Sequence, residues 1–347
     1  MNKIQKAYAS APKTWVWQLL AAFIVACLLA WSGTAVRVSS STGNGLEVAG
    51  NILSGIFHPS AKLLLTLGTD GVPYLLLETF CIAFLGTIVG AVISLPLSFL
   101  SASNLVPRGV ALVGRVLIAA IRTIPAFVYG LMFIRVTGPG PFAGLLTMSL
   151  CSIGMVSKMF IESIEDLDKR ILESLDAAGC TTFQKIRYGI LPQLTADFTS
   201  TIIYRFDMNL RDATVLGLVG AGGIGLLLNE KISWREYGRV GAILVCLFVT
   251  VCCIEWLSHA LGRIIRGERS IPRRAKRVLW AAVLVCVVVC TAGIEAPDLA
   301  HTSKSVLAAM GDGLLHPDWR FFFGTGKDGL GWLLLETVGI ALAGTGL

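Results

Sequence analysis

Residues 72–100 read VPYLLLETFCIAFLGTIVGAVISLPLSFL, and Glu78 is the one charged side chain among these 29 positions. A helix needs about 20 apolar residues to cross the hydrocarbon core of a bilayer, so this run predicts a transmembrane helix. The composition of the whole chain agrees, because 54% of its 347 residues are hydrophobic and 15% are charged, whereas a soluble domain has about 25% charged residues. A soluble enzyme, a disordered chain and a secreted disulfide scaffold are thereby excluded.

Further apolar runs lie on both sides of this one. They cover residues 15–36, 110–134, 142–161, 198–228, 237–261 and 278–294, and another begins at residue 331. The first run is longer than the apolar region of about 7–15 residues in a signal peptide, so we interpret it as an uncleaved anchor. The pattern predicts an all-α, polytopic protein of the lipid bilayer, with a six-span unit, a seventh span and the start of an eighth.

The positive charges indicate the orientation. The net charge is +7, but Lys and Arg gather in the loops between apolar runs, which is typical of membrane topology and gives no reason to expect a nucleic-acid partner. If the N-terminus is cytoplasmic, the inside segments carry 16 Lys and Arg residues and the outside segments carry 8. Short cytoplasmic loops retain positive charge, so we predict a cytoplasmic N-terminus.

An internal repeat connects the two ends of the sequence. Residues 74–87 (YLLLETFCIAFLGT) align with residues 332–345 (WLLLETVGIALAGT), and nine of the fourteen positions are identical. The same offset of 258 places residues 58–59 (His-Pro) on residues 316–317 (His-Pro), and the first apolar run on the seventh. Six predicted spans separate the copies, so both have the same orientation and the repeat is parallel.

The repeat and the apolar runs divide the chain into three predicted regions. Residues 1–71 hold the anchor span and an external segment, and residues 72–265 form a core transmembrane domain. Residues 266–347 hold a basic linker, the seventh span, an external segment and the start of the second copy. A helix that crosses half of a bilayer leaves polar backbone groups in hydrocarbon, so we expect this second copy, truncated in its second span, to continue beyond Leu347.

Residues 162–195 form a cytoplasmic loop with a helical pattern. The pattern predicts an amphipathic helix, a break at Gly179, and a second short helix that ends at Pro192. Such a helix suits docking into a groove of a partner, and packing on its own helical bundle explains the pattern equally well. Its apolar residues at helical spacing are Leu167, Ile171, Leu175 and Ala178.

This loop resembles the EAA loop of permease subunits of ABC importers. The resemblance rests on Glu173, on Gly179 six residues later and on Leu191-Pro192. In that family the loop is a coupling helix that sits in a cleft of a separate cytoplasmic ATPase. The sequence departs from the family pattern where Ser174 and Leu175 replace two alanines and Gly189 replaces an aliphatic residue. The resemblance assigns ATPase coupling to Glu173, Asp176, Ala178, Gly179, Leu191 and Pro192.

Two more stretches, residues 122–126 (RTIPA) and 204–225 (YRFDMNLRDATVLGLVGAGGIG), resemble the phosphonate-type permeases, whose members also handle related oxyanions. The resemblance implies a multi-pass transport permease of the bacterial inner membrane rather than an enzyme, without a cofactor of its own. It implies three protein partners: a cytoplasmic ABC ATPase, an extracytoplasmic substrate-binding protein, and a second permease copy, fused or separate. A secondary transporter of a small anion is the alternative, because parallel repeats and intramembrane charges are also typical of that class.

Charged and polar residues lie near the middle of the fifth apolar run. A charge at the bilayer centre costs at least about 2.5–3.5 kcal/mol, so such side chains are expected to face protein or a water-filled path. We expect Arg205 and Arg211 to line the route of an anion, with Asp207 limiting the positive charge. A structural ion-pair network between helices is the alternative. The residues assigned to the translocation path are Arg205, Asp207, Asn209 and Arg211.

The remaining motifs point away from catalysis in this chain. Residues 220–225 (GAGGIG) match the dinucleotide fingerprint GxGxxG, but they end an apolar run and no acid follows about 20 residues later. We therefore expect close helix packing or a helix end there. Glu78 and its repeat Glu336 lie near the entrance of a span, where a capping or interfacial role is favoured over a gate. The sequence has no P-loop and no metal-ligand spacing, so we predict no catalytic or metal site and assign ATP hydrolysis to a separate subunit.

Overall fold

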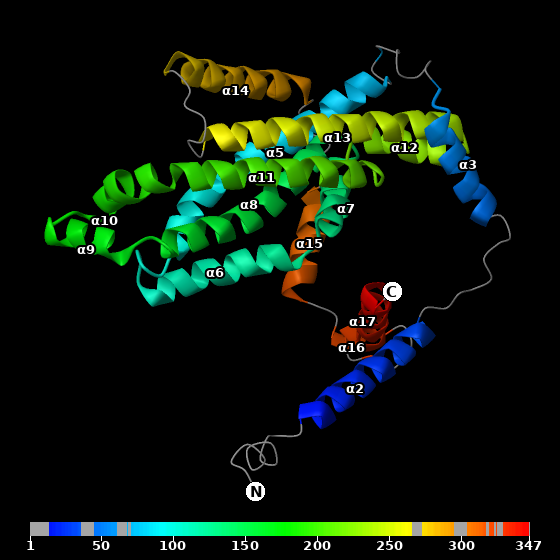
Figure 1. The fold of residues 1–347 in the computed structure, drawn as a ribbon, viewed down its shortest axis with the longest axis horizontal. Coiled ribbons are helices and arrows are strands. Elements are labelled where there is room, and N and C mark those ends of the chain that lie inside the picture. Colours follow the sequence, from blue (N-terminus) through cyan, green and yellow to red (C-terminus); the bar gives the residue numbers. More distant parts are fainter. Residues whose placement is uncertain are drawn as a thin grey trace, which may run out of the picture. The chain divides into compact units, whose positions relative to one another are not determined.

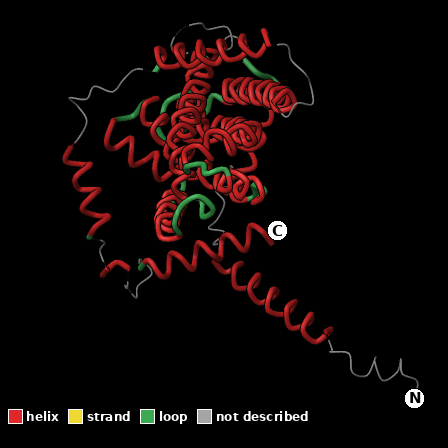
Figure 2. The backbone as a smooth tube through the Cα atoms, turned by 90° about the vertical axis from the view of Figure 1, so that its left-hand side faces the viewer, coloured by secondary structure: helices red, strands yellow, loops and turns green. Residues whose placement is uncertain are grey.

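The computed structural model contains helices and no strand over the residues that it describes (Figure 2). Contacts divide the chain into two units, one of Met1–Glu47 with Ala308–Leu347 and one of Val48–Leu307, and each is described by itself. Residues 1–13 and 266–272, on which some of the topology prediction rests, lie outside the described residues. The described residues are 14–35, 45–60, 68, 71–265, 273–294, 304–316, 319–322, 324 and 329–346.

The helices follow one another along the chain as Figure 1 labels them. The smaller unit holds α2 (Thr14–Ala35), most of α15 (Lys304–Leu315), α16 (Trp319–Phe322) and α17 (Leu330–Gly346). The larger unit holds most of α3 (Gly45–Phe57), then α5 (Val72–Ser101), α6 (Arg108–Thr123), α7 (Ala126–Thr137), α8 (Pro141–Glu165), α9 (Lys169–Ala177), α10 (Thr182–Gln184), a π-helical turn (Lys185–Ile190), α11 (Leu191–Gly217), α12 (Ile224–Ser233), α13 (Tyr237–Ile265) and α14 (Arg273–Gly293).

The core of the larger unit is the crossing of α5 and α8. Gly86 of α5 faces Met148 of α8, and Gly90 faces Ser152, so closely that a Cβ atom on either glycine would overlap the Cβ atom opposite. Small residues of this kind let two helix backbones approach in a membrane protein. α11 packs against both helices and completes a hydrophobic cluster that includes Ile82, Leu85, Met148, Leu210 and Leu216.

Within the described residues, α5, α8 and α13 are long and apolar enough to cross a membrane. They match the predicted runs 72–100, 142–161 and 237–261. The predicted span over residues 110–134 is bent, because α6 and α7 meet at an angle of 84° around Ile124–Pro125, as in a broken span or a re-entrant loop. Proline lacks a backbone N–H and disfavours a helical conformation in the residue before it, so α6 ends there.

The other predicted spans form helices that are too short or too polar to meet the same criterion. The first, seventh and eighth runs form α2, α14 and α17, whose described apolar stretches have 10–17 residues. α11 has 27 residues, but its charged side chains make it too polar for the same criterion. The six-span count and the second copy therefore stay predictions.

The fifth apolar run, residues 198–228, contains two helices. α11 ends at Gly217, and α12 begins after a turn in which Gly220, Gly222 and Gly223 have φ angles of 102°, 81° and 76°. Glycine adopts these angles readily because it has no Cβ atom. The GxGxxG motif is therefore a turn between two helices, in agreement with the expected helix end.

The start of α5 caps α12 at this turn. Thr79 Oγ1 accepts a hydrogen bond from the N–H of Ile224 at 2.8 Å, and Glu78 Oε1 accepts one from the N–H of Gly223 at 3.3 Å. The first N–H groups of a helix have no partner within the helix, so the Glu-Thr pair supplies acceptors that α12 needs. The capping interpretation is confirmed for Glu78, whereas Glu336 is an exposed residue of α17.

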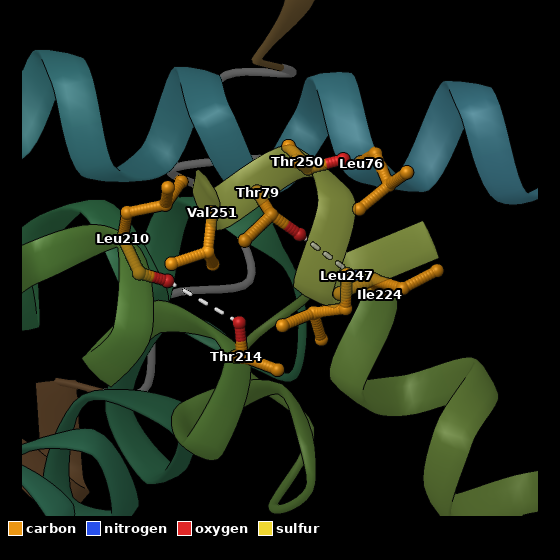
Figure 3. Close-up of a pocket in the computed structure, with 8 residues that line it drawn as sticks. All are labelled: Leu76, Thr79, Leu210, Thr214, Ile224, Leu247, Thr250 and Val251. Carbon is orange, nitrogen blue, oxygen red and sulfur yellow. Dashed lines mark hydrogen bonds between the residues drawn. The ribbon is translucent and has the colours of Figure 1, made fainter. Parts of the chain in front are cut away.

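A small cavity lies beside this cap (Figure 3). Its volume is about 10 Å³, roughly the space of one water molecule. Threonine hydroxyls and aliphatic side chains from α5, α11, α12 and α13 surround it, so the capped N–H groups sit in mostly apolar surroundings, where an unpaired N–H is unfavourable. The lining residues are Leu76, Thr79, Leu210, Thr214, Ile224, Leu247, Thr250 and Val251.

Candidate functional site

The loop after α8 folds back onto the core. Asp168 caps α9 by accepting a hydrogen bond from the N–H of Arg170 at 3.0 Å. On the inner face of α9, Leu172 is buried and belongs to one cluster with Phe160 and Ile164 of α8. Packing on its own bundle thus holds one face of α9, while the opposite face stays exposed through Glu173, Ser174, Asp176 and Ala177.

Gly179 ends α9 in the left-handed region, with a φ angle of 75°. Its N–H donates to Asp176 O at 2.9 Å, and the N–H of Cys180 donates to Leu175 O at 3.0 Å. This pair of bonds is a Schellman motif, which usually has glycine at this position. Among the described residues, no atom lies within 4 Å of the place where a Cβ would stand, so the backbone conformation alone calls for glycine. The predicted break at Gly179 is confirmed.

The prediction that Pro192 ends a second short helix is wrong. After the turn, Thr181 and Gln184 form a capping box in which the N–H of Thr181 donates to Gln184 Oε1 at 2.8 Å. The chain then continues through the π-helical turn into α11, where Pro192 lies in the first turn. The N–H of Leu191 donates to Ile186 O five residues back. A wider turn of this kind accommodates a proline that the interior of an α-helix would exclude.

Leu175 of α9 and Gly189 of the π-helical turn fit against each other. Gly189 is buried, and a Cβ atom there would overlap Cδ1 of Leu175. The Leu175 side chain thus takes the space that a side chain at position 189 would need. This contact joins α9 to the segment that continues into α11.

Four of the residues assigned to coupling lie on the exposed side of the loop, namely Glu173, Asp176, Ala178 and Gly179. Asp176 forms an ion pair with Lys185 across the turn. The other two lie at the base of the loop, where Leu191 is half-buried and Pro192 is exposed. The predicted apolar face is only partly covered, because Ala178 is exposed whereas Leu167, Ile171 and Leu175 are half-buried.

Two aromatic residues of the loop escaped the sequence analysis. Phe183 is 70% exposed and Tyr188 is 68% exposed. The guanidinium carbon of Arg187 lies 6.0 Å from the centre of the Tyr188 ring. Aromatic residues and Arg are enriched at protein interfaces, so aromatic positions in a polar loop were the signal that could have found them.

α11 presents its polar residues on two faces, and one of them is buried. Asn209 donates from Nδ2 to Thr87 Oγ1 at 2.8 Å and to Ser152 Oγ at 2.7 Å. Arg205 is 5% exposed and donates from Nε to the same Ser152 Oγ at 3.2 Å. These bonds tie α11 to α5 and α8, so Arg205 and Asn209 lie within the helix packing.

The other polar face of α11 borders a groove of about 360 Å³ between α11 and α13. Arg211 Nη2 lies 2.7 Å from Asp207 Oδ2 and 3.4 Å from Glu255 Oε1 of α13. The side chain of Arg211 is 50% exposed. Sequence reasoning missed Glu255, although a carboxylate inside an apolar run is itself a signal. The groove is also lined by Ser200, Ile203, Tyr204, Ser258, His259 and Gly262.

The structure therefore separates the four residues assigned to the path into two pairs. Residues four apart share a face of a helix and residues two apart do not, so Asp207 lies with Arg211, and Arg205 lies with Asn209. The two carboxylates outweigh the single positive charge of Arg211 when both are ionised, but its half-exposed guanidinium can still donate charge-assisted hydrogen bonds to an oxyanion in the groove. Within the described residues, no three His, Cys, Asp or Glu side chains gather as metal ligands.

A family model described as "Binding-protein-dependent transport system inner membrane component" matches residues 94–267, about half of the chain. The chain belongs to this family. The permease is thus a multi-pass inner-membrane protein and the transmembrane component of an ABC importer, and its role is transport rather than catalysis.

Three relatives show what the permease is similar to. The phosphite transport system permease protein PtxC of Stutzerimonas stutzeri is 37% identical over 189 residues, which are 54% of this chain and 69% of the relative. The phosphate-import permease protein PhnE of Mycolicibacterium smegmatis is 35% identical over 220 residues, 63% of this chain and 41% of the relative. The putative cryptic phosphonate transport system permease protein PhnE2 of Escherichia coli is 37% identical over 119 residues, 34% of this chain and 98% of the relative.

We predict that Leu175 and Gly189 are energetically coupled. Leu175→Ala leaves a gap and Gly189→Leu overpacks the contact, so each single variant is expected to lower the free energy of unfolding by about 1–3 kcal/mol. The double variant restores the volume and is expected to recover most of the loss. Thermal unfolding of the unaltered protein, the two single variants and the double variant, each purified in detergent, gives the coupling energy. Strictly additive losses would contradict the fit.

Proposed function

We propose that the permease imports phosphonate or a related oxyanion, such as phosphite or phosphate, across the inner membrane. A separate cytoplasmic ABC ATPase would drive the cycle, and an extracytoplasmic binding protein would deliver the substrate. The observation that carries this proposal is the similarity, at 35–37% identity, to permeases named for phosphite, phosphate and phosphonate. The groove beside Arg211 supports it, because a guanidinium binds oxyanions through charge-assisted hydrogen bonds.

The ATPase is proposed to bind the exposed side of the cytoplasmic loop of residues 162–195. Two observations support this. The side of α9 that carries Glu173 is exposed, and the hydrogen-bonded turn at Gly179 fixes the conformation of the C-terminal end of α9. We add Phe183 and Tyr188 as contacts, because both aromatic side chains are exposed in the same loop. The coupling residues remain those assigned above, namely Glu173, Asp176, Ala178, Gly179, Leu191 and Pro192.

The polar residues of α11 are proposed to have two roles. Arg211 is assigned to the anion and Asp207 to limiting the positive charge, since both side chains line the groove. Arg205 and Asn209 are assigned to the position of α11, since both donate to Ser152 within the packing. The alternative of an ion-pair network between helices concerns the first pair, because Arg211 also lies within ion-pair distance of Glu255 of α13.

We also propose that two copies of a six-span unit enclose the path, with a cytoplasmic N-terminus. The core transmembrane domain is assigned to residues 72–265, after the anchor region of residues 1–71, and the second copy begins near residue 331 within the C-terminal region of residues 266–347. The fourteen-residue repeat supports the pair of copies. The PhnE relative also supports it, since 220 residues are 41% of that permease, which is therefore longer than this chain.

The energy source tests the proposal directly. Uptake of phosphite by cells that carry the complete transport system is expected to stop when the ATPase is deleted, and to persist when an ionophore collapses the proton gradient. Uptake that survives loss of the ATPase and stops with the ionophore would favour a secondary transporter.

Gly179→Val is predicted to abolish phosphite uptake without preventing membrane insertion. A β-branched residue is a conformational outlier at positive φ, whereas asparagine adopts this region much more readily, so Gly179→Asn is the matched control with near-normal uptake. Membrane fractionation checks that both proteins insert. Normal uptake by an inserted Gly179→Val protein would refute the role of the turn in coupling.

Arg211→Ala is predicted to weaken phosphite uptake while the ATPase still co-purifies. A charge-assisted hydrogen bond contributes about 1.5–3 kcal/mol, so the apparent affinity is expected to fall about 10- to 100-fold. Arg205→Ala is the comparison, and its expected effect is a lower thermal unfolding midpoint, because it removes a contact between α11 and α8. The reverse pattern would move the anion route to Arg205.

A further inference from the structure

The groove between α11 and α13 carries more negative than positive charge. The two helices pack side by side (Figure 1), and Asp207, Arg211 and Glu255 all line the groove between them. When both carboxylates are ionised, they leave one negative charge in excess. The other titratable side chains that line the groove are Tyr204 of α11 and His259 of α13. An anion with two charges is therefore repelled by the carboxylates more strongly than an anion with one.

Arg211 gives only part of its guanidinium to the two carboxylates. Its contacts, at 2.7 Å to Asp207 Oδ2 and 3.4 Å to Glu255 Oε1, are both made by Nη2. A guanidinium has five N–H donors, so these two contacts leave the donors on Nη1 and Nε. The Arg211 side chain is 50% exposed, and these donors can therefore bind the oxygens of an anion.

Asp207 has more acceptor capacity than its surroundings satisfy. Arg211 donates to Oδ2, while Oδ1 is buried and has no hydrogen-bond partner among the described residues. An ionised carboxylate only accepts hydrogen bonds, and a buried acceptor without a donor is unfavourable. Rotation about the Cβ–Cγ bond exchanges the two oxygens, because this torsion of Asp is broad. A ligand that carries a hydrogen-bond donor satisfies this carboxylate, whereas a fully ionised oxyanion carries none.

We propose that the groove selects the protonated, monoanionic form of its oxyanion, and that Asp207 determines this specificity. The ionised oxygens of the ligand accept hydrogen bonds from Arg211, and its P–OH group donates to the Asp207 carboxylate. The inference rests on the proposed function, since it takes the groove as the anion site. Phosphoryl groups gain and lose their second proton near neutral pH, so both ionisation states are present for the groove to distinguish.

The same contact predicts which anions the groove rejects. Sulfate and the sulfonates are also tetrahedral oxyanions, but they carry no proton at neutral pH. Each of them would place an oxygen lone pair against the oxygen lone pairs of Asp207, and such an unpaired contact disfavours the wrong ligand. Arg211 alone could not make this distinction, because a guanidinium donates to any ionised oxygen.

Methylphosphonate and methanesulfonate are a matched pair of probes. Below the second pKa of methylphosphonate both are monoanions of nearly the same shape, and they differ by one hydroxyl proton. Equilibrium dialysis measures their affinities for the full permease with its ATPase in lipid nanodiscs, without a binding protein, so that the permease alone selects the ligand. Methylphosphonate is expected to bind about 10- to 100-fold more tightly, the range for a hydrogen bond to a charged group.

The ratio of the two affinities isolates the proton on the ligand. Methanesulfonate stays a monoanion above that pKa, so a change in its own binding reports titration of the groove, for example of His259. The ratio is expected to fall toward one, or below one, when methylphosphonate becomes a dianion. A ratio near one below the pKa, or a ratio that rises above it, would overturn the selection of the protonated form. This comparison needs no variant.

Two variants test whether Asp207 determines the selection. Asp207→Asn is expected to bring the ratio close to one, because an amide can donate to a sulfonate oxygen as well as accept from a hydroxyl. Asp212→Asn is the matched control, since it also removes a negative charge from α11 but Asp212 is not one of the residues that line the groove. Binding of methanesulfonate shows that each variant has folded. The same ratio in both variants would overturn the role of Asp207.

Phosphite uptake by cells with the complete transport system keeps this result apart from the proposed function. Normal uptake combined with a ratio near one would overturn the inference alone. Normal uptake by a permease that binds no methylphosphonate would do the same. A high ratio in a permease that fails to import phosphite would support the inference and overturn phosphite as the substrate.

Discussion

Ser152 lies where α5 and α8 cross, and its hydroxyl accepts hydrogen bonds from both Asn209 and Arg205 of α11. The crossing is close because Gly86 and Gly90 put no side chain between the two helices. Within a bilayer there is no water to satisfy a polar group, so each donor of α11 must find its acceptor in the protein. The position of α11, and with it the groove and the end of the loop that precedes α11, follows from this contact.

α11 links the two regions proposed to act in transport. The N-terminal end of α11 continues from the π-helical turn without a break. Its C-terminal end is followed by the glycine turn and then by α12, which Glu78 and Thr79 cap. One face is held by α5 and α8, while the other carries Arg211 into the groove. Because α9 contacts the π-helical turn through Leu175 and Gly189, and that turn continues into α11, a displacement of α9 would be passed toward the proposed anion site.

Local patterns predicted the helical class, most of the apolar helices and the break at Gly179. The bend at Pro125 was also readable from the sequence, because proline disfavours a helical residue before it, but a run of apolar residues hides the bend. Helical spacing divides the four polar residues of α11 into two pairs, yet only the neighbouring helices decide which pair is buried. The fit between Leu175 and Gly189 had no local signal, since the two residues are fourteen positions apart and meet across a turn.

That fit also limits which substitutions the loop can accept one at a time. With leucine at position 175, an aliphatic residue at position 189 would produce a steric collision, and overpacking of this kind costs about 1–3 kcal/mol. A smaller residue at position 175 would instead remove atoms and leave room near the loop surface. Position 189 can therefore accept a large side chain only where position 175 holds a small one, so the two positions are expected to vary together among working variants of this loop.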